Sequence, residues 1–229
     1  SAKASVTYRG AVEIGKHVAC DAFDETRPIR VVSHAHADHM IGLKKSLRIC
    51  EKVLMTKPTK DLIDVMMGPL FLMGGFVDTL DYGKTLQYKE ERITFFHVDH
   101  ILGAAQVLVE NEDGTRCVYT GDFRLSQTPI IEADVLVTEA TYGNPFQVRP
   151  FERVVEHALV SLVEFGLKLG PVYAFGYHGK LQEVMQILHE ADVEAPLVVP
   201  ERVFHVARVC EQHGMHLGRV MLSEEREAK

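Results

Sequence analysis

Short runs of β-branched and alternating apolar residues dominate the first part of the chain. Such runs predict strands over residues 5–8, 11–14 and 17–20. The apolar run Ile29–Ser33 predicts a buried strand that ends directly on a cluster of histidines. The same patterns, with a turn sequence at 111–114, predict further strands at 52–55, 85–88, 92–98, 105–110, 116–120 and 134–138.

Apolar residues at helical spacing predict the helices. Helices are expected at 39–47, 56–67, 150–168, 180–190 and 201–213, and the back half adds strands at 171–175 and 196–199. The Gly- and Met-rich stretch 68–76 is interpreted as a hydrophobic loop or helix end near the mouth of a site, with plain core packing as the alternative. The front half is rich in strands, and the back half alternates helix and strand. This order favours stacked sheets covered by helices, so the predicted fold class is α/β, in the α+β sense.

Composition limits the classes of protein to which the chain can belong. Its 229 residues suffice for one substantial domain, or for one domain with a partial second one. The formal net charge of −7 argues against broad adhesion to nucleic acid, which relies on clustered Lys and Arg. It does not exclude a nuclease, because bound cations reverse the local field at a site. No apolar run approaches the roughly 18–20 residues of a membrane span, and no signal peptide is evident.

The cysteines are widely scattered and show no CxxC spacing. They are Cys20, Cys50, Cys117 and Cys210. We therefore expect a reducing, cytoplasmic location and no disulfide framework. Each thiol is expected to be a small buried hydrophobe that takes no part in chemistry.

The most informative segment follows the predicted strand Ile29–Ser33. It holds three histidines and an aspartate within six residues: His34, His36, Asp38 and His39. His34 and His36, on a loop leaving a strand end, can converge on one ion, and Asp38 and His39 then turn toward a second position. Neutral imidazole and carboxylate oxygen are ligands that zinc prefers, at about 2.0–2.2 Å. The alternative is a solvent-exposed, histidine-rich turn.

Further ligands are available at later strand ends. His100 follows the strand predicted at 92–98, and Asp122 follows the strand at 116–120 through Gly121. A carboxylate held on a tight glycine turn is well placed to bridge two metals. Taken alone, His100 could equally be a histidine that caps a turn, and Asp122 could equally be a turn-forming residue. Their order after the histidine cluster favours the metal site.

The run HAHADH, residues 34–39, resembles the HxHxDH signature of the metallo-β-lactamase superfamily. His100 and Asp122 resemble the ligand motifs that follow in that family. Asp21 is similar to the early aspartate that supports the histidine loop without binding metal; a turn residue is the alternative. The resemblance implies a four-layer αββα sandwich with a two-metal site.

Three segments resemble a narrower branch. DHILGAAQV at 99–107 is similar to the GHxxGSA element, and VLVTEATYGNP at 135–145 to the ESTYG element, of the β-CASP nucleases, which process RNA or repair DNA. The match implies that Glu139 is the acidic residue close to the metals; the alternative is a surface carboxylate. PVYAFGYHGKLQEVM at 171–185 resembles a strand, turn and helix of the branch, in which Lys180 opens a helix that can receive a phosphate. An ordinary lysine at a helix start is the alternative.

The chain also departs from the branch. Members usually continue further and supply a last histidine ligand for the second metal; His178 is the best candidate to replace it. Asp99 stands where the branch has glycine, which alters the turn that orients His100. We expect a single metallo-β-lactamase-like domain over 1–229, in which about 145–229 is a reduced or truncated β-CASP portion.

The resemblance implies a zinc-dependent hydrolase, an exonuclease or endonuclease acting on RNA or DNA. Two Zn²⁺ ions, or Mn²⁺, are expected as cofactors, and a homodimer that walls in the site is plausible for a short form. One ion would be held by His34, His36 and His100, and the other by Asp38, His39 and a bridging Asp122. Two other functions stay open: a small-molecule hydrolase with the same core, and a catalytically weak metal-binding subunit of a nucleic-acid-processing complex.

Overall fold

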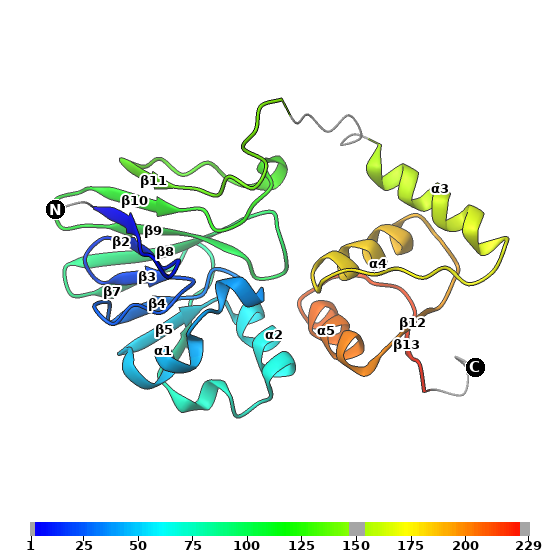
Figure 1. Ribbon diagram of the computed structural model, residues 1–229, viewed down its shortest axis with the longest axis horizontal. Helices are drawn as coiled ribbons and strands as arrows, with labels where there is room; N and C mark the ends of the chain where they lie inside the picture. The colour runs from blue at the N-terminus through cyan, green and yellow to red at the C-terminus, as the bar shows by residue number, and fades with distance from the viewer. Residues whose placement is uncertain (1–2, 147–153, 225–229) are drawn as a thin grey trace. The chain divides into compact units, whose positions relative to one another are not determined.

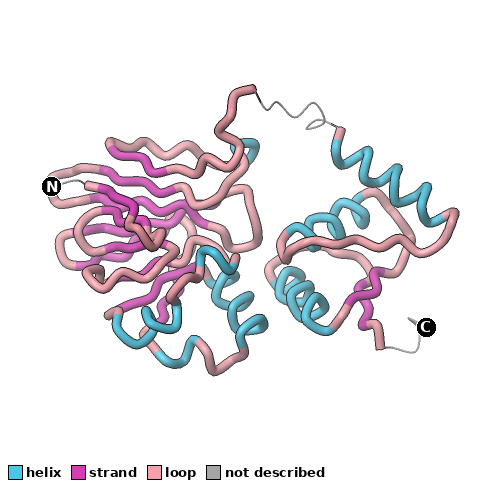
Figure 2. Tube along the Cα trace, viewed as in Figure 1, coloured by secondary structure: helices cyan, strands magenta, loops and turns pink. Residues whose placement is uncertain are grey.

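The computed structural model describes residues 3–146 and 154–224. The chain divides into two compact units, Ser1–Glu139 and Ala140–Lys229, and each is described by itself. Figure 1 labels the elements, and Figure 2 shows that strands dominate the first unit while helices dominate the second.

The first unit contains a sheet of order β1-β2-β3-β4-β5-β6. Its strands are β1 (Ala4–Val6), β2 (Val12–Ile14), β3 (Val18–Cys20), β4 (Ile29–Val31), β5 (Lys52–Met55) and β6 (Val77–Thr79). The first three strands pair in antiparallel fashion, and β3 to β6 pair in parallel. The parallel strands therefore end at one edge of the sheet, and the histidine segment leaves from that edge after β4.

A second sheet, of order β11-β10-β9-β8-β7, packs against the first. Its strands are β7 (Thr85–Tyr88), β8 (Glu91–His97), β9 (Ala105–Glu110), β10 (Arg116–Tyr119) and β11 (Val135–Val137). All neighbours are antiparallel except β10 and β11. Strand β9 lies between β8 and β10, so these two strands form no hydrogen bonds with each other. The loops that follow β8 and β10 are therefore not joined by the sheet.

Strand β4 shows how the layers are built. Ile29 and Val31 are fully buried in the core between the sheets, where they join residues such as Phe95 of the second sheet. Arg30 points to the opposite face and donates to the Ser46 hydroxyl of α1 (Leu43–Ile49). The first unit is thus layered as helix, sheet and sheet. These layers confirm the mixed α/β class and supply three of the four layers of the predicted sandwich.

Helix α2 (Lys57–Met67) begins as the sequence predicts. Thr56 is its N-cap, and the Thr56 hydroxyl accepts a hydrogen bond from the Thr59 amide at 3.3 Å. Within 68–76, Leu72 is buried whereas Leu70, Met73 and Phe76 are exposed. Core packing therefore accounts for only part of this apolar stretch.

The second unit has three helices and two short strands in its described part. They are α3 (Val155–Leu167), α4 (Lys180–Glu190), β12 (Leu197–Val199), α5 (Glu201–Gln212) and β13 (Val220–Leu222). Strands β12 and β13 pair in parallel. The first residues of the helix predicted at 150–168 lie outside the described residues.

The strand predicted at 171–175 is wrong. Residues 171–177 form a loop, and Tyr173 and Phe175 are largely exposed. A strand needs a hydrogen-bonded neighbour, and β12 and β13 pair only with each other in the part of the second unit that the structure describes.

Most other predicted elements are confirmed to within a few residues. The helix predicted at 39–47 begins later, at Leu43, because the short 3-10 helix η1 (Ala37–His39) and a left-handed Gly42 precede it. Strands β6 and β13, three residues each, were not predicted. All four cysteines are free and buried, as expected. None of the helices in the described ranges is long and apolar enough to cross a membrane.

Candidate metal centre

Three loops bring the candidate ligands together at one edge of the stacked sheets. His34 and His36 follow β4, His100 follows β8, and Asp122 follows β10. Gly121, with φ +60°, makes the turn before Asp122, and a Cβ there would come within 3.2 Å of the Ser33 hydroxyl. Glycine therefore lets the third loop approach the histidine loop closely.

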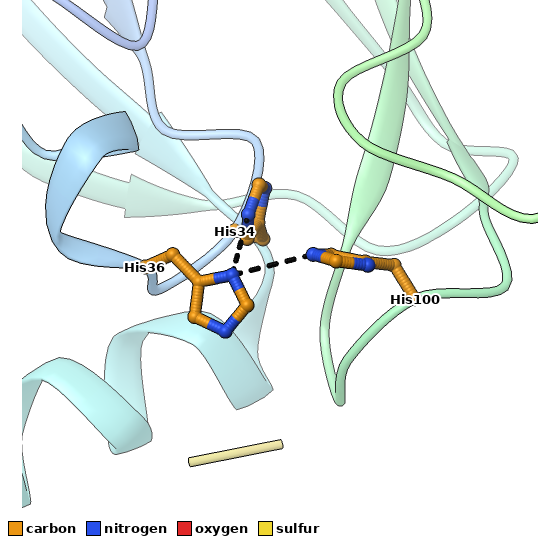
Figure 3. A group of neighbouring side chains, drawn as sticks. All are labelled: His34, His36 and His100. Carbon is orange, nitrogen blue, oxygen red and sulfur yellow. Dashed lines mark hydrogen bonds between the residues drawn. The ribbon is translucent and has the colours of Figure 1, made fainter. Parts of the chain in front are cut away.

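The first group of possible ligands consists of three imidazoles (Figure 3). His34 Nε2 lies 3.1 Å from His36 Nδ1, and His100 Nε2 lies 3.3 Å from the same nitrogen. His34 is fully buried, while His36 and His100 are partly exposed, so solvent reaches one side of the group.

The second group consists of His34, His39 and Asp122. Asp122 Oδ2 lies 3.4 Å from His39 Nε2 and 3.9 Å from His34 Nε2. It also lies 3.8 Å from His100 Nε2, so this oxygen stands between the two groups. His34 is shared by both groups.

The three shortest of these separations fit zinc, whereas Asp122 Oδ2 lies farther from His34 and His100, at 3.9 and 3.8 Å. Four ligands at about 2.0–2.1 Å from a tetrahedral zinc lie about 3.3 Å from one another. The nitrogen–nitrogen and nitrogen–oxygen distances of 3.1, 3.3 and 3.4 Å match that spacing. Imidazole and carboxylate are also the donor types that zinc accepts.

Asp21 lies beneath the groups and holds two of the histidines. It is buried, and its Oδ2 accepts hydrogen bonds from His39 Nδ1 at 2.7 Å and from the Ser33 hydroxyl at 2.7 Å. The Ser33 oxygen lies 3.0 Å from His34 Nδ1 and, because its own proton is donated to Asp21, accepts a hydrogen bond from that nitrogen. Both imidazoles are therefore held with Nε2 facing Asp122. This is how an outer carboxylate orients metal-binding histidines.

Sequence reasoning missed three residues that support this arrangement. Tyr119 donates to Asp21 Oδ2 at 2.9 Å. Ser33 links Asp21 to His34, and Arg30 donates to the backbone oxygen of His39 at 3.2 Å. The one available signal was Arg30, a charged residue inside the apolar run Ile29–Ser33.

The electrostatics differ between the two groups. Burial, together with the nearby His36, lowers the pKa of His100 to about 4, so its imidazole is neutral at pH 7. Burial also opposes charge on His39, but hydrogen bonds to Asp122 and Asp21 outweigh it and raise its pKa to about 10. The hydrogen bond from His39 lowers the pKa of Asp122.

Two predicted acidic residues lie beside the groups. Asp38 belongs to neither group; its side chain is 77% exposed, with Oδ2 3.6 Å from His39 Nε2. Glu139 Oε1 accepts a hydrogen bond from the Phe123 amide at 3.2 Å and so supports the turn that carries Asp122.

His178 and Lys180 belong to the second unit. Lys180 is the first residue of α4 and pairs with Glu183 at 2.5 Å. Gln182 accepts from the Gly179 amide at 2.7 Å at the same helix start. The roles of His178 and Lys180 at the metal site stay predictions.

No protein-family model matches the chain, but several relatives do. The chain is 37% identical over 138 residues to an uncharacterised protein from the lig 3′ region of Acidianus ambivalens, covering 59% of this chain and 99% of that protein. It is 30% identical over 185 residues to an RNase J-like protein of Methanocaldococcus jannaschii, covering 69% of this chain and 42% of the relative. It is also 30% identical over 206 residues to the endoribonuclease YSH1 of Yarrowia lipolytica, covering 74% of this chain and 24% of the relative.

The last two relatives are ribonucleases by name, and they share the branch that the motifs of this chain resemble. The chain belongs to the β-CASP branch of the metallo-β-lactamase superfamily. This confirms the resemblance carried by residues 34–39, 99–107 and 135–145. The β-CASP chain spans less than half the length of these two relatives.

Proposed function

We propose that this β-CASP protein is a zinc-dependent hydrolase that cleaves phosphodiester bonds of RNA. One observation carries the proposal: residues from three strand ends form two ligand groups that share His34, with Asp122 Oδ2 between them. A pair of divalent ions there would lower the pKa of a water molecule towards about 7 and offset the charge of a phosphodiester.

The chain's own residues prepare this chemistry. Asp21 and Ser33 fix His34 and His39 so that their Nε2 atoms face Asp122. His100 is neutral at pH 7 and therefore offers its lone pair without losing a proton. The exposed carboxylate of Asp38, 3.6 Å from His39 Nε2, is placed to accept a proton at the solvent side of the site. Glu139 steadies the Asp122 turn.

RNA is favoured over DNA because the named relatives are ribonucleases. The partly exposed His36, His100 and Asp122 leave the groups open on one side, which suits a polymer better than an enclosed small molecule. Lys180, at the start of α4, is proposed to contact a phosphate of the substrate, and His178 to complete the second metal site. Two zinc ions per chain, a homodimer and a cytoplasmic location belong to the same proposal.

The test combines metal analysis with cleavage. We expect about two zinc ions per chain and zinc- or manganese-dependent cleavage of labelled single-stranded RNA that exceeds cleavage of the same DNA sequence. His36→Ala should abolish cleavage. His205→Ala, which removes an exposed histidine paired with Glu201 on α5, should leave it unchanged.

The alternatives give different results. Turnover of a generic phosphodiester without cleavage of either polymer would indicate a small-molecule hydrolase. RNA binding that survives His36→Ala, with no turnover by the wild type, would indicate a weak metal-binding subunit.

A further inference from the structure

Asp99 fastens two loops of the candidate metal centre to each other. It immediately precedes His100, and its side chain reaches the loop that follows Asp122. Asp99 Oδ1 accepts a hydrogen bond from Arg124 Nη2 at 2.9 Å, and Oδ2 accepts one from the Ser126 hydroxyl at 2.7 Å. Both carboxylate oxygens are thus used by the other loop.

The backbone of Asp99 joins the same loop. The Arg124 amide donates to the Asp99 carbonyl at 2.7 Å, and the two residues form an isolated antiparallel bridge. The Asp99 amide donates to the Thr128 hydroxyl at 2.9 Å, and that hydroxyl donates to the Arg124 carbonyl at 2.6 Å. Main chain and side chain together therefore hold the two loops in one register.

This connection replaces one that the sheet does not provide. The loops leave β8 and β10, which β9 separates, so no ladder hydrogen bond fixes the distance between His100 and Asp122. Their ligand atoms, His100 Nε2 and Asp122 Oδ2, nevertheless lie 3.8 Å apart. Asp99 is adjacent to the first and Arg124 two residues beyond the second.

We propose that Asp99 is a positioning residue of the metal centre, which sets the separation of His100 from Asp122 through Arg124 and Ser126. The inference rests on the proposed metal centre and deepens it. The Asp99 and Arg124 side chains are 19% and 49% exposed. An ion pair this exposed adds little to global stability, so its loss should appear in metal binding more than in unfolding.

The test substitutes Asp99→Asn in the full chain and measures metal binding directly. Zinc affinity by chelator competition should fall by about 10-fold, the lower end for loss of an outer-shell partner of a metal ligand. With cobalt(II) in place of zinc, the visible absorption bands should shift, because they report ligand geometry. Arg124→Gln should reproduce the affinity loss, and the double variant should lose no more than either single variant.

The matched control is Asp113→Asn. Asp113 also holds a turn, through the Thr115 amide at 3.0 Å, and lies in the β9–β10 hairpin. It should keep wild-type zinc affinity and the wild-type cobalt spectrum. If Asp99→Asn fails to fold, the same zinc and cobalt measurements on Arg124→Gln replace it, because the Arg124 side chain is half-exposed.

Outcomes separate this inference from the proposed function. A wild-type chain that binds no zinc or cobalt overturns the proposed metal centre and the role of Asp99 with it. A wild type that binds both metals, with unchanged affinity and spectrum in Asp99→Asn or its replacement variant, overturns only the role of Asp99. Loss of zinc affinity in Asp113→Asn equal to that in Asp99→Asn also overturns it, since the effect would then be a general one of turn loosening.

Discussion

The Asp21 carboxylate accepts four hydrogen bonds, from the Ser33 amide and hydroxyl, His39 Nδ1 and the Tyr119 hydroxyl. It does so from a left-handed backbone conformation, φ +65°, that aspartate tolerates better than most residues. One buried side chain therefore fixes the orientation of both histidines that face Asp122. Its effect on the site is indirect, because none of its oxygens belongs to either ligand group.

We predict that Asp21→Asn weakens both folding and metal binding. An amide cannot accept at both ends, so at least one buried donor loses its partner, at a cost of about 1–3 kcal/mol in the free energy of unfolding. Zinc affinity should fall about 10–100-fold, since the imidazoles lose their outer partner. Urea denaturation and chelator competition measure the two effects. Unchanged zinc affinity would show that His34 and His39 need no support from Asp21.

The raised pKa of His39 predicts a pH dependence for the metal-free protein. Its folded pKa of about 10 lies above its ordinary value of 6.5, so the folded state holds a proton that the unfolded state has lost. The stabilisation is complete below about pH 6.5 and disappears as pH rises through 10. The free energy of unfolding of chelator-treated protein should therefore fall across that range. His39→Gln should flatten this part of the profile; an equally steep fall in the variant would contradict the assignment.

At the scale of elements, β4 and α1 support the histidine loop through Arg30. This guanidinium is 1% exposed and donates to the carbonyls of His39 and Ile41 and to the Ser46 hydroxyl. Burial lowers the pKa of Arg30, and the hydrogen bonds compensate for its loss of water. A strand residue that faces away from the inter-sheet core thus fixes the backbone of the loop beyond η1.

We predict that Arg30→Met is strongly destabilising although the new side chain is apolar and of similar length. The part-buried carbonyls of His39 and Ile41 and the buried Ser46 hydroxyl would lose the donor that Arg30 supplies, which should cost on the order of 3 kcal/mol in the free energy of unfolding. Arg92→Met is the control, because Arg92 lies on β8 with its side chain 57% exposed and only a 3.9 Å contact to Glu110. It should change stability by less than about 0.5 kcal/mol. Equal effects of the two substitutions in urea denaturation would contradict this role of Arg30.

The elements also show what sequence can reveal. Strands over 52–55, 85–88 and 105–110 were predicted at their observed bounds, because each is a short apolar or alternating run of the kind that favours a strand. The strand at 171–175 was wrong, because periodicity does not report whether a partner strand is present. The ligand candidates His34, His36 and His100 could be found because they adjoin strand ends. The contacts of Arg30 and Asp99 could not, since they join segments whose pairing only the folded chain reveals.

At the scale of the whole molecule, both ligand groups lie in the first unit, Ser1–Glu139, whereas His178 and Lys180 belong to the second. The relatives with assigned names extend well beyond the length of this chain. Whether the second unit contributes a metal ligand can be tested by substituting one residue, His178.

We predict that His178→Ala reduces bound zinc from about two ions per chain to about one, because the proposed function makes His178 the last ligand of the second ion. Mass spectrometry under non-denaturing conditions or metal analysis after dialysis would show the change. His205→Ala, an exposed histidine in α5 of the same unit, should retain both ions. Two ions in His178→Ala would mean that solvent or another residue completes the site.

His34 belongs to both ligand groups, yet Ser33 occupies its Nδ1, which leaves a single lone pair on Nε2. One lone pair can coordinate only one cation at a time, so ions at the two positions would compete for the His34 imidazole. The ion that gains it leaves its neighbour with a poorer set of donors, and the second ion must be held more weakly. Occupancy should then rise in two steps as zinc becomes available, and a half-filled protein would predominate wherever free zinc is scarce.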